Sequence, residues 1–185
     1  LGPPGASMQC RLASRLTRTS GLSRAGAMAK DISHDLQQVA EAVRQKRLAA
    51  EDIKLLREKI AELDEAGTEH RFVKTVLRNL KVAGTQLRDI QERNPGEPFD
   101  EKTFEQLPEH LRKRIITRLD NIAKRMRRLS GQNRPAEYND PAFRCLQDYE
   151  TCRKQAKLSI VWCQLAMVVC LLRAALTLSI RHGSQ

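Results

Sequence analysis

Four of the five cysteines lie near the end of the chain with a symmetric spacing. They are Cys145, Cys152, Cys163 and Cys170, so the gaps between them are 7, 11 and 7 residues. At about 100° per residue, each gap is within about 20° of a whole number of helical turns. One continuous helix would therefore carry all four thiols on a single stripe.

The same positions also fit an antiparallel helical hairpin folded about residues 157–158. Disulfides Cys145–Cys170 and Cys152–Cys163 would then bridge the two helices, because the partners of each pair are equally far from the fold point. Within one helix neither seven-residue pair could bridge, since seven residues rise about 10 Å and a disulfide needs its α-carbons within about 7 Å. The spacing predicts either a stapled hairpin in an oxidising compartment or free thiols. The expected turn contains no glycine or proline, which counts against the hairpin.

Of three other interpretations of the segment, two remain open. The run from Leu158 to Ile180 has the length of a membrane span, with three cations before it and Arg181 beyond it. A buried core helix with free thiols is equally compatible, because free cysteine packs like a small hydrophobic residue. Zinc held by the four thiolates is not expected, since zinc ligands usually come in pairs only two to four residues apart.

A second candidate is the basic amphipathic helix expected over residues 109–129. Its apolar residues follow one face, at Leu111, Ile115, Leu119, Ile122, Met126 and Leu129. Its other faces carry Arg112, Lys113, Arg114, Arg118, Lys124, Arg125, Arg127 and Arg128. Such a helix could bind the phosphates of nucleic acid, anionic headgroups or an acidic protein.

The alternative is that this basic face is neutralised within the protein. Acids of the helix expected over residues 51–66, namely Glu58, Glu62 and Glu65, would then pair with it. No aromatic residue is interleaved with the cations, so stacking on bases is not expected.

The sequence offers little for catalysis. His34, His70, His110 and His182 are scattered, and there is no phosphate-binding glycine loop, nucleophile elbow or zinc-protease motif. We therefore expect no catalytic residues, no metal and no cofactor, and a protein that is not an enzyme.

Composition and periodicity predict an all-α protein. Only 4% of the 185 residues are aromatic and 30% are charged. Beyond the basic helix, we expect helices over residues 32–47 and 51–66 and one from an N-cap at Thr68 to about Arg93. Gly67 should end the second helix, Gly84 marks a close approach or a weak point, and Asp100 should cap a short turn.

These elements suggest four parts along the chain. Residues 1–29 are basic and contain no acid, as in a transit peptide or a non-native extension. Residues 30–130 should form a small helical bundle, residues 131–141 a linker rich in proline and glycine, and residues 142–181 the cysteine-bearing helix or hairpin.

The function favoured by the sequence is that of a non-enzymatic interaction module. It would self-associate or dock a protein partner through the C-terminal segment, because a small bundle can hardly bury a helix that is apolar nearly all round. The alternatives are a nucleic-acid-binding protein using the basic helix and a small membrane-anchored protein. The compartment is oxidising if the cysteines are bridged, and otherwise cytoplasmic or membrane-associated.

Overall fold

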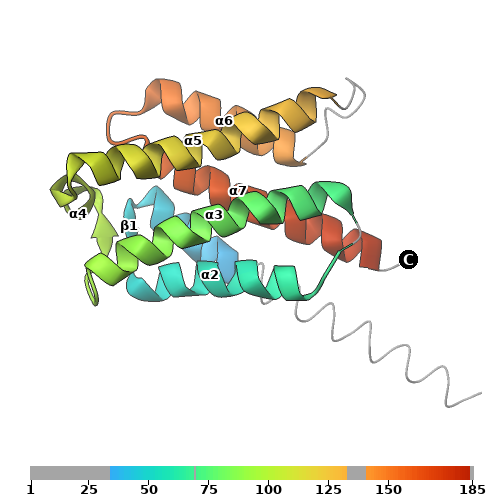
Figure 1. Cartoon of the computed structure of the whole chain (residues 1–185), viewed down its shortest axis with the longest axis horizontal. Helices are drawn as coiled ribbons and strands as arrows, with labels where there is room; N and C mark the ends of the chain where they lie inside the picture. Colours follow the sequence, from blue (N-terminus) through green and yellow to red (C-terminus); the bar gives the residue numbers. More distant parts are fainter. Residues whose placement is uncertain (1–33, 69, 133–140, 184–185) are drawn as a thin grey trace, which may run out of the picture.

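The computed structural model describes residues 34–68, 70–132 and 141–183. These residues are almost entirely helical, as predicted (Figure 1). The predicted leader over residues 1–29 and most of the predicted linker lie outside the described residues.

The N-terminal part holds three of the predicted helices. A helix covers residues 34–44, α2 covers Ala50–Glu65 and α3 covers Arg71–Arg93. The first ends earlier than predicted, because the chain turns at Lys46, whose φ of 56° lies in the left-handed region. The chain then forms the short strand β1, Arg47–Leu48, which pairs antiparallel with β2, Phe99–Asp100. This two-residue ladder was not predicted from the sequence.

Two local predictions about helix ends have different outcomes. Gly67 follows α2 with a φ of 67°, which confirms it as the glycine that ends the helix. Thr68, however, is not the N-cap of α3. That position belongs to His70, whose Nδ1 accepts a hydrogen bond of 3.4 Å from the Val73 amide, while Thr68 Oγ1 accepts one from the His70 amide. Histidine is not a usual capping residue, so this cap could not be predicted from the sequence.

Gly84 does not mark a close approach of two helices. A β-carbon at this position would meet only Ile60 Cδ1, at 3.9 Å, which is an ordinary van der Waals distance. Of the two predicted roles, only a locally weak point in α3 fits this geometry.

The middle of the chain forms a short and a long helix. Asp100 caps α4, Glu101–Gln106, through a 2.9 Å hydrogen bond accepted from the Thr103 amide, as predicted. The basic helix α5 covers Glu109–Gln132. It passes the predicted end at Ser130 and Gly131, since a single glycine weakens a helix without forcing it to stop.

The C-terminal segment is the stapled hairpin. Helix α6, Pro141–Gln155, and helix α7, Val161–Gly183, run side by side after a turn at residues 156–160. Disulfides Cys145–Cys170 and Cys152–Cys163 join them, with α-carbons 5.6 and 5.7 Å apart. The pairing inferred from the spacing is therefore confirmed, and the continuous helix is excluded.

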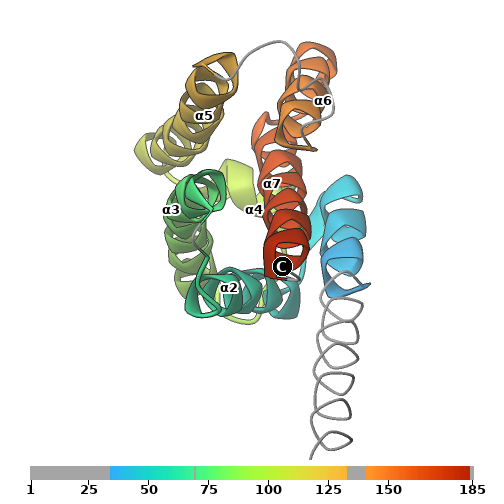
Figure 2. The same ribbon diagram turned by 90° about the vertical axis from the view of Figure 1, so that its right-hand side faces the viewer.

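Helix α7 lies in the middle of the bundle. Figure 2 shows it between α6, α3, α2 and the helix over residues 34–44, and it contacts α2, α3, α5 and α6. Its buried residues include Trp162, Leu165, Val168, Leu171 and Ala175, which join one core with residues of the earlier helices. The expectation that a small bundle could hardly bury this segment is wrong, because all the other long helices surround it. The predicted domain boundaries stay a prediction.

Candidate functional site

The basic helix α5 lies on the outside of the bundle, between α3 and α6. Its apolar face is directed inward as predicted, with Ile115, Leu119, Ile122 and Met126 buried and Leu111 and Leu129 partly buried. The cations of α5 therefore lie outside this buried apolar face. They are on the α6 side of the helix, on its α3 side or on its solvent side.

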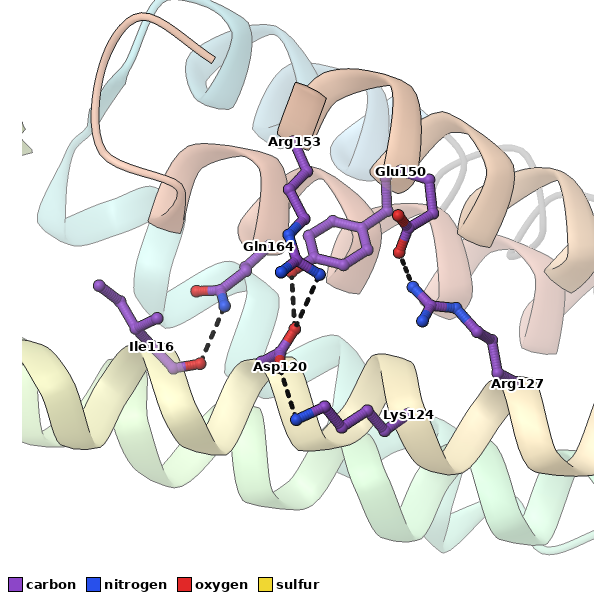
Figure 3. Close-up of polar contacts among 8 residues, drawn as sticks. Ile116, Asp120, Lys124, Arg127, Glu150, Arg153 and Gln164 are labelled. Carbon is purple, nitrogen blue, oxygen red and sulfur yellow. Dashed lines mark hydrogen bonds and ion pairs between the residues drawn. The ribbon is translucent and has the colours of Figure 1, made fainter. Parts of the chain in front are cut away.

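Cations on the α6 side are paired. Lys124 lies 3.1 Å from Asp120 one turn earlier, and Arg127 forms an ion pair with Glu150 of α6 (Figure 3). Near the start of the helix, Lys113 Nζ lies 2.8 Å from Glu109. These three predicted site residues are thus partly neutralised where they stand.

Cations on the α3 side are not paired. Arg114, Arg118, Arg125 and Arg128 share this side of α5, and in the described part of the chain none of them has a carboxylate partner. All are exposed except Arg118, which is half-buried, and they extend over about 21 Å at 1.5 Å per residue. We call these four residues the free arginine row. Arg112 is half-buried and does not belong to it.

The acids of α2 do not neutralise this row. Glu62 pairs with Lys59 at 3.0 Å and Glu58 lies 3.9 Å from Lys54, so both acids pair within their own helix. Helix α3 also lies between α2 and α5 in both views of the bundle (Figures 1 and 2). The sequence left open that these acids pair with α5, and the structure does not show this for Glu58 or Glu62. Glu65 has no ion pair within the described residues.

A polar cluster centred on Asp120 joins α5 to the hairpin. The Tyr149 hydroxyl donates a hydrogen bond of 3.1 Å to Asp120, and Arg153 of α6 lies 4.0 Å from the same carboxylate (Figure 3). Beside it, the buried Gln164 of α7 donates a 2.9 Å hydrogen bond to the Ile116 carbonyl. The hairpin is thus fixed to α5 by polar contacts as well as by packing.

The cluster shifts the pKa values of its members in opposite directions. Burial raises the pKa of Asp120, but hydrogen bonds from Lys124 and Tyr149 and the charge of Arg153 outweigh it, so this pKa is lowered. Burial and the neighbouring Asp120 charge raise the pKa of Tyr149. At neutral pH the pair is therefore a carboxylate facing a neutral phenol.

Replacing Asp120 with Asn should destabilise the protein at pH 7 by about 1–2 kcal/mol, because charge-assisted hydrogen bonds are lost. A carboxyl group with a lowered folded pKa stabilises above its unfolded pKa of about 3.9, and this contribution fades as pH falls through the folded pKa. The difference in free energy of unfolding between wild type and Asp120→Asn should thus become smaller in acid, as measured by urea unfolding from pH 7 to 3. The control is Asp148→Asn, which changes an exposed carboxylate. A difference between wild type and Asp120→Asn that does not depend on pH would refute the stabilising role of the ionised Asp120.

Glu101 of α4 holds the turn of the hairpin. Its Oε2 accepts a 2.7 Å hydrogen bond from the Trp162 indole, and its Oε1 accepts from the Ser159 amide at 3.3 Å and from the Ser159 hydroxyl. The carboxylate therefore lies at the N-terminus of α7, where negative charge is favoured. This clamp explains why the turn needs neither glycine nor proline. The sequence could not reveal it, because Glu101 and Trp162 are 61 residues apart.

The histidines remain apart from one another in the described structure. His34 bonds to Gln38, His70 caps α3 and His110 is exposed. Across the described residues no three histidine, cysteine or acidic side chains are grouped as metal ligands. The four predicted site cysteines are all used in disulfides.

Comparisons of the chain with protein-family models, with curated proteins and with solved structures find no match. By length and composition, Val161–Ser179 of α7 could cross a membrane, but most of that stretch is buried inside the bundle. Function must therefore be argued from the surfaces and covalent links described above.

Proposed function

We propose that this protein binds nucleic acid through the phosphate backbone, using the free arginine row of α5. The supporting observation is a set of four arginines on one side of a rigid helix without carboxylate partners among the described residues. Guanidinium groups suit this role because they stay charged and bind phosphate oxygens with two parallel hydrogen bonds.

The surroundings favour a phosphate backbone over a lipid surface. An amphipathic helix binds a membrane by burying its apolar face in the bilayer, whereas the apolar face of α5 is already used in the protein core. Leu158, on the hairpin turn, is the exposed large hydrophobic residue found in the described structure. Among the described residues, no membrane-inserting surface therefore adjoins the row.

The same surroundings favour contacts with phosphates over contacts with bases. Phe72 and Phe143 are half-buried, and the other described aromatic side chains are buried. Binding should therefore depend little on base sequence, since stacking platforms need exposed rings. Over about 21 Å of duplex axis the backbone carries about twelve charges at 1.7 Å each, enough to engage all four arginines.

The salt dependence of binding tests this proposal. Four phosphate contacts on duplex DNA predict a slope of about −4 for log affinity against log salt concentration, and Arg125→Ala with Arg128→Ala should reduce its magnitude by about 2. Fluorescence anisotropy with a labelled 20-base-pair duplex would measure both slopes.

A matched double variant controls for net charge. Lys54→Ala with Arg44→Ala removes the same two charges from α2 and the helix over residues 34–44, on the far side of the bundle from α5. It should leave the slope nearly unchanged. Equal effects of the two double variants, or no binding at about 50 mM salt, where phosphate contacts are strong, would rule out the proposal.

The burial of α7 removes the observation on which docking through the C-terminal segment was based. The absence of enzymatic activity stays a prediction. The two disulfides favour folding in an oxidising compartment.

A further inference from the structure

We propose that the Cys152–Cys163 disulfide is a site of thiol–disulfide exchange with a small thiol such as glutathione, and that opening it releases the end of α6 from α5. The exchange site stands on the structure alone.

The bridge is accessible at the tip of the hairpin. Cys152 and Cys163 both line an open cleft of about 490 Å³ together with the turn residues, including Leu158, which is 46% exposed. Cys152 is half-buried whereas Cys163 is only 3% exposed, so an incoming thiolate reaches the sulfur of Cys152. Attack there expels Cys163.

Cys163 is placed to be the better leaving group. It is the third residue of α7, where the free amides and the dipole of a long helix stabilise a thiolate. Lys46 and Lys157 line the same cleft and add positive charge. Asp148 is the acidic residue among those that line it. The Glu101 carboxylate lies at the same helix end through its hydrogen bonds to Ser159 and Trp162, so its negative charge opposes part of this stabilisation.

The second bridge, Cys145–Cys170, has a less favourable leaving group. It also borders a cleft, of about 370 Å³, in which Cys170 is half-buried. Arg44, Arg173 and Asp148 line that cleft, so its charges match those of the first cleft and the difference lies in the helix positions of the cysteines. Attack on Cys170 would expel Cys145, which is the fifth residue of α6 and lies beyond its first turn. A thiolate at that position gains little from the helix N-terminus, because the effect fades within one turn.

The exchange is balanced with two equivalents of thiol. The first thiolate bonds to the sulfur of Cys152 and breaks the disulfide, and Cys163 leaves as a thiolate that takes a proton. A second thiolate then attacks the sulfur of the small thiol in the mixed disulfide, which releases Cys152 as a thiol and forms the oxidised small disulfide. Two electrons pass to the protein.

Opening the bridge removes the covalent anchor of the second half of α6. From residue 147 to the end of α6, Tyr149 is the buried side chain and Cys152 is half-buried. The remaining polar links to α5 are the Tyr149–Asp120 hydrogen bond and the Glu150–Arg127 and Arg153–Asp120 ion pairs. When this half-helix moves away, the Glu150–Arg127 ion pair between α6 and α5 is lost.

Differential alkylation tests the exchange site. The full-length oxidised protein is incubated with reduced glutathione, quenched with an alkylating reagent at intervals and mapped by peptide mass. Cys152 and Cys163 should be modified at least about tenfold faster than Cys145 and Cys170, since the better leaving group exchanges faster. Equal rates, or earlier opening of Cys145–Cys170, would overturn the proposal.

Hydrogen exchange tests the release. The double variant Cys152→Ser/Cys163→Ser should exchange backbone amides of residues 149–155 faster than wild type, and Cys145→Ser/Cys170→Ser should not. Unchanged protection of these amides would overturn the release.

Absence of duplex binding in wild type would reject the proposed function, while alkylation and hydrogen exchange would still decide the exchange site.

Discussion

Replacing the four hairpin cysteines with serine should lower the free energy of unfolding by about 5 kcal/mol. A disulfide that closes a loop of about 15 residues contributes roughly 3 kcal/mol, and the two bridges here close loops with sequence separations of 11 and 25. Because one loop lies inside the other, the sum should be slightly less than two independent contributions. Since domains are stable by only about 5–15 kcal/mol, much of the variant should be unfolded at 37 °C.

Urea unfolding monitored by far-ultraviolet circular dichroism measures this loss. The wild-type protein under reducing conditions is the control, because it lacks the bridges without adding serine hydroxyls to the buried positions Cys145 and Cys163. Both samples should unfold at a much lower urea concentration than the oxidised protein. A shift equivalent to less than about 1 kcal/mol would show that packing of the hairpin does not depend on its bridges.

Replacing Glu101 with Ala should cost about 3 kcal/mol. The substitution removes the acceptor for the Trp162 indole and for the Ser159 amide and hydroxyl, and hydrogen bonds to a charged group contribute about 1.5–3 kcal/mol each. Trp162 is only 4% exposed, so its N–H would be left without a partner in the protein interior.

The matched control is Glu105→Ala, which removes an exposed carboxylate from the same short helix. Its free energy of unfolding should stay within about 0.5 kcal/mol of wild type. The fluorescence of Trp162, the sole tryptophan of the chain, reports the change at the clamp directly. Equal stabilities of the two variants would contradict the assigned role of Glu101.

The sequence predicted most of the helices, and it predicted the disulfide pairing as one of several open alternatives, because both depend on local periodicity. The apolar face of α5 follows a 3.6-residue repeat, and the equal distances of the cysteine pairs from one point define a hairpin register. Helix ends were less accurate, as at Ser130, because capping depends on a few individual hydrogen bonds.

What the sequence could not predict depends on contacts between distant residues. The turn of the hairpin lacked turn-forming residues, and its support came from Glu101 in another helix. The division of the α5 cations into paired and free sets likewise depended on Glu150 of α6 and on the position of α2. Whether α7 was an exposed, membrane-spanning or buried helix depended on which elements surrounded it.

The central position of α7 has a consequence for synthesis on the ribosome. The ribosome synthesises α7 after all the other described helices. The apolar faces of α2, α3 and α5 that contact α7 therefore stay exposed until it emerges. A nascent chain that ends before residue 141 would expose those faces and tend to aggregate. We therefore expect the chain to reach its native state only once α7 has been made, rather than helix by helix, a delay that would leave time for passage across a membrane before the disulfides form.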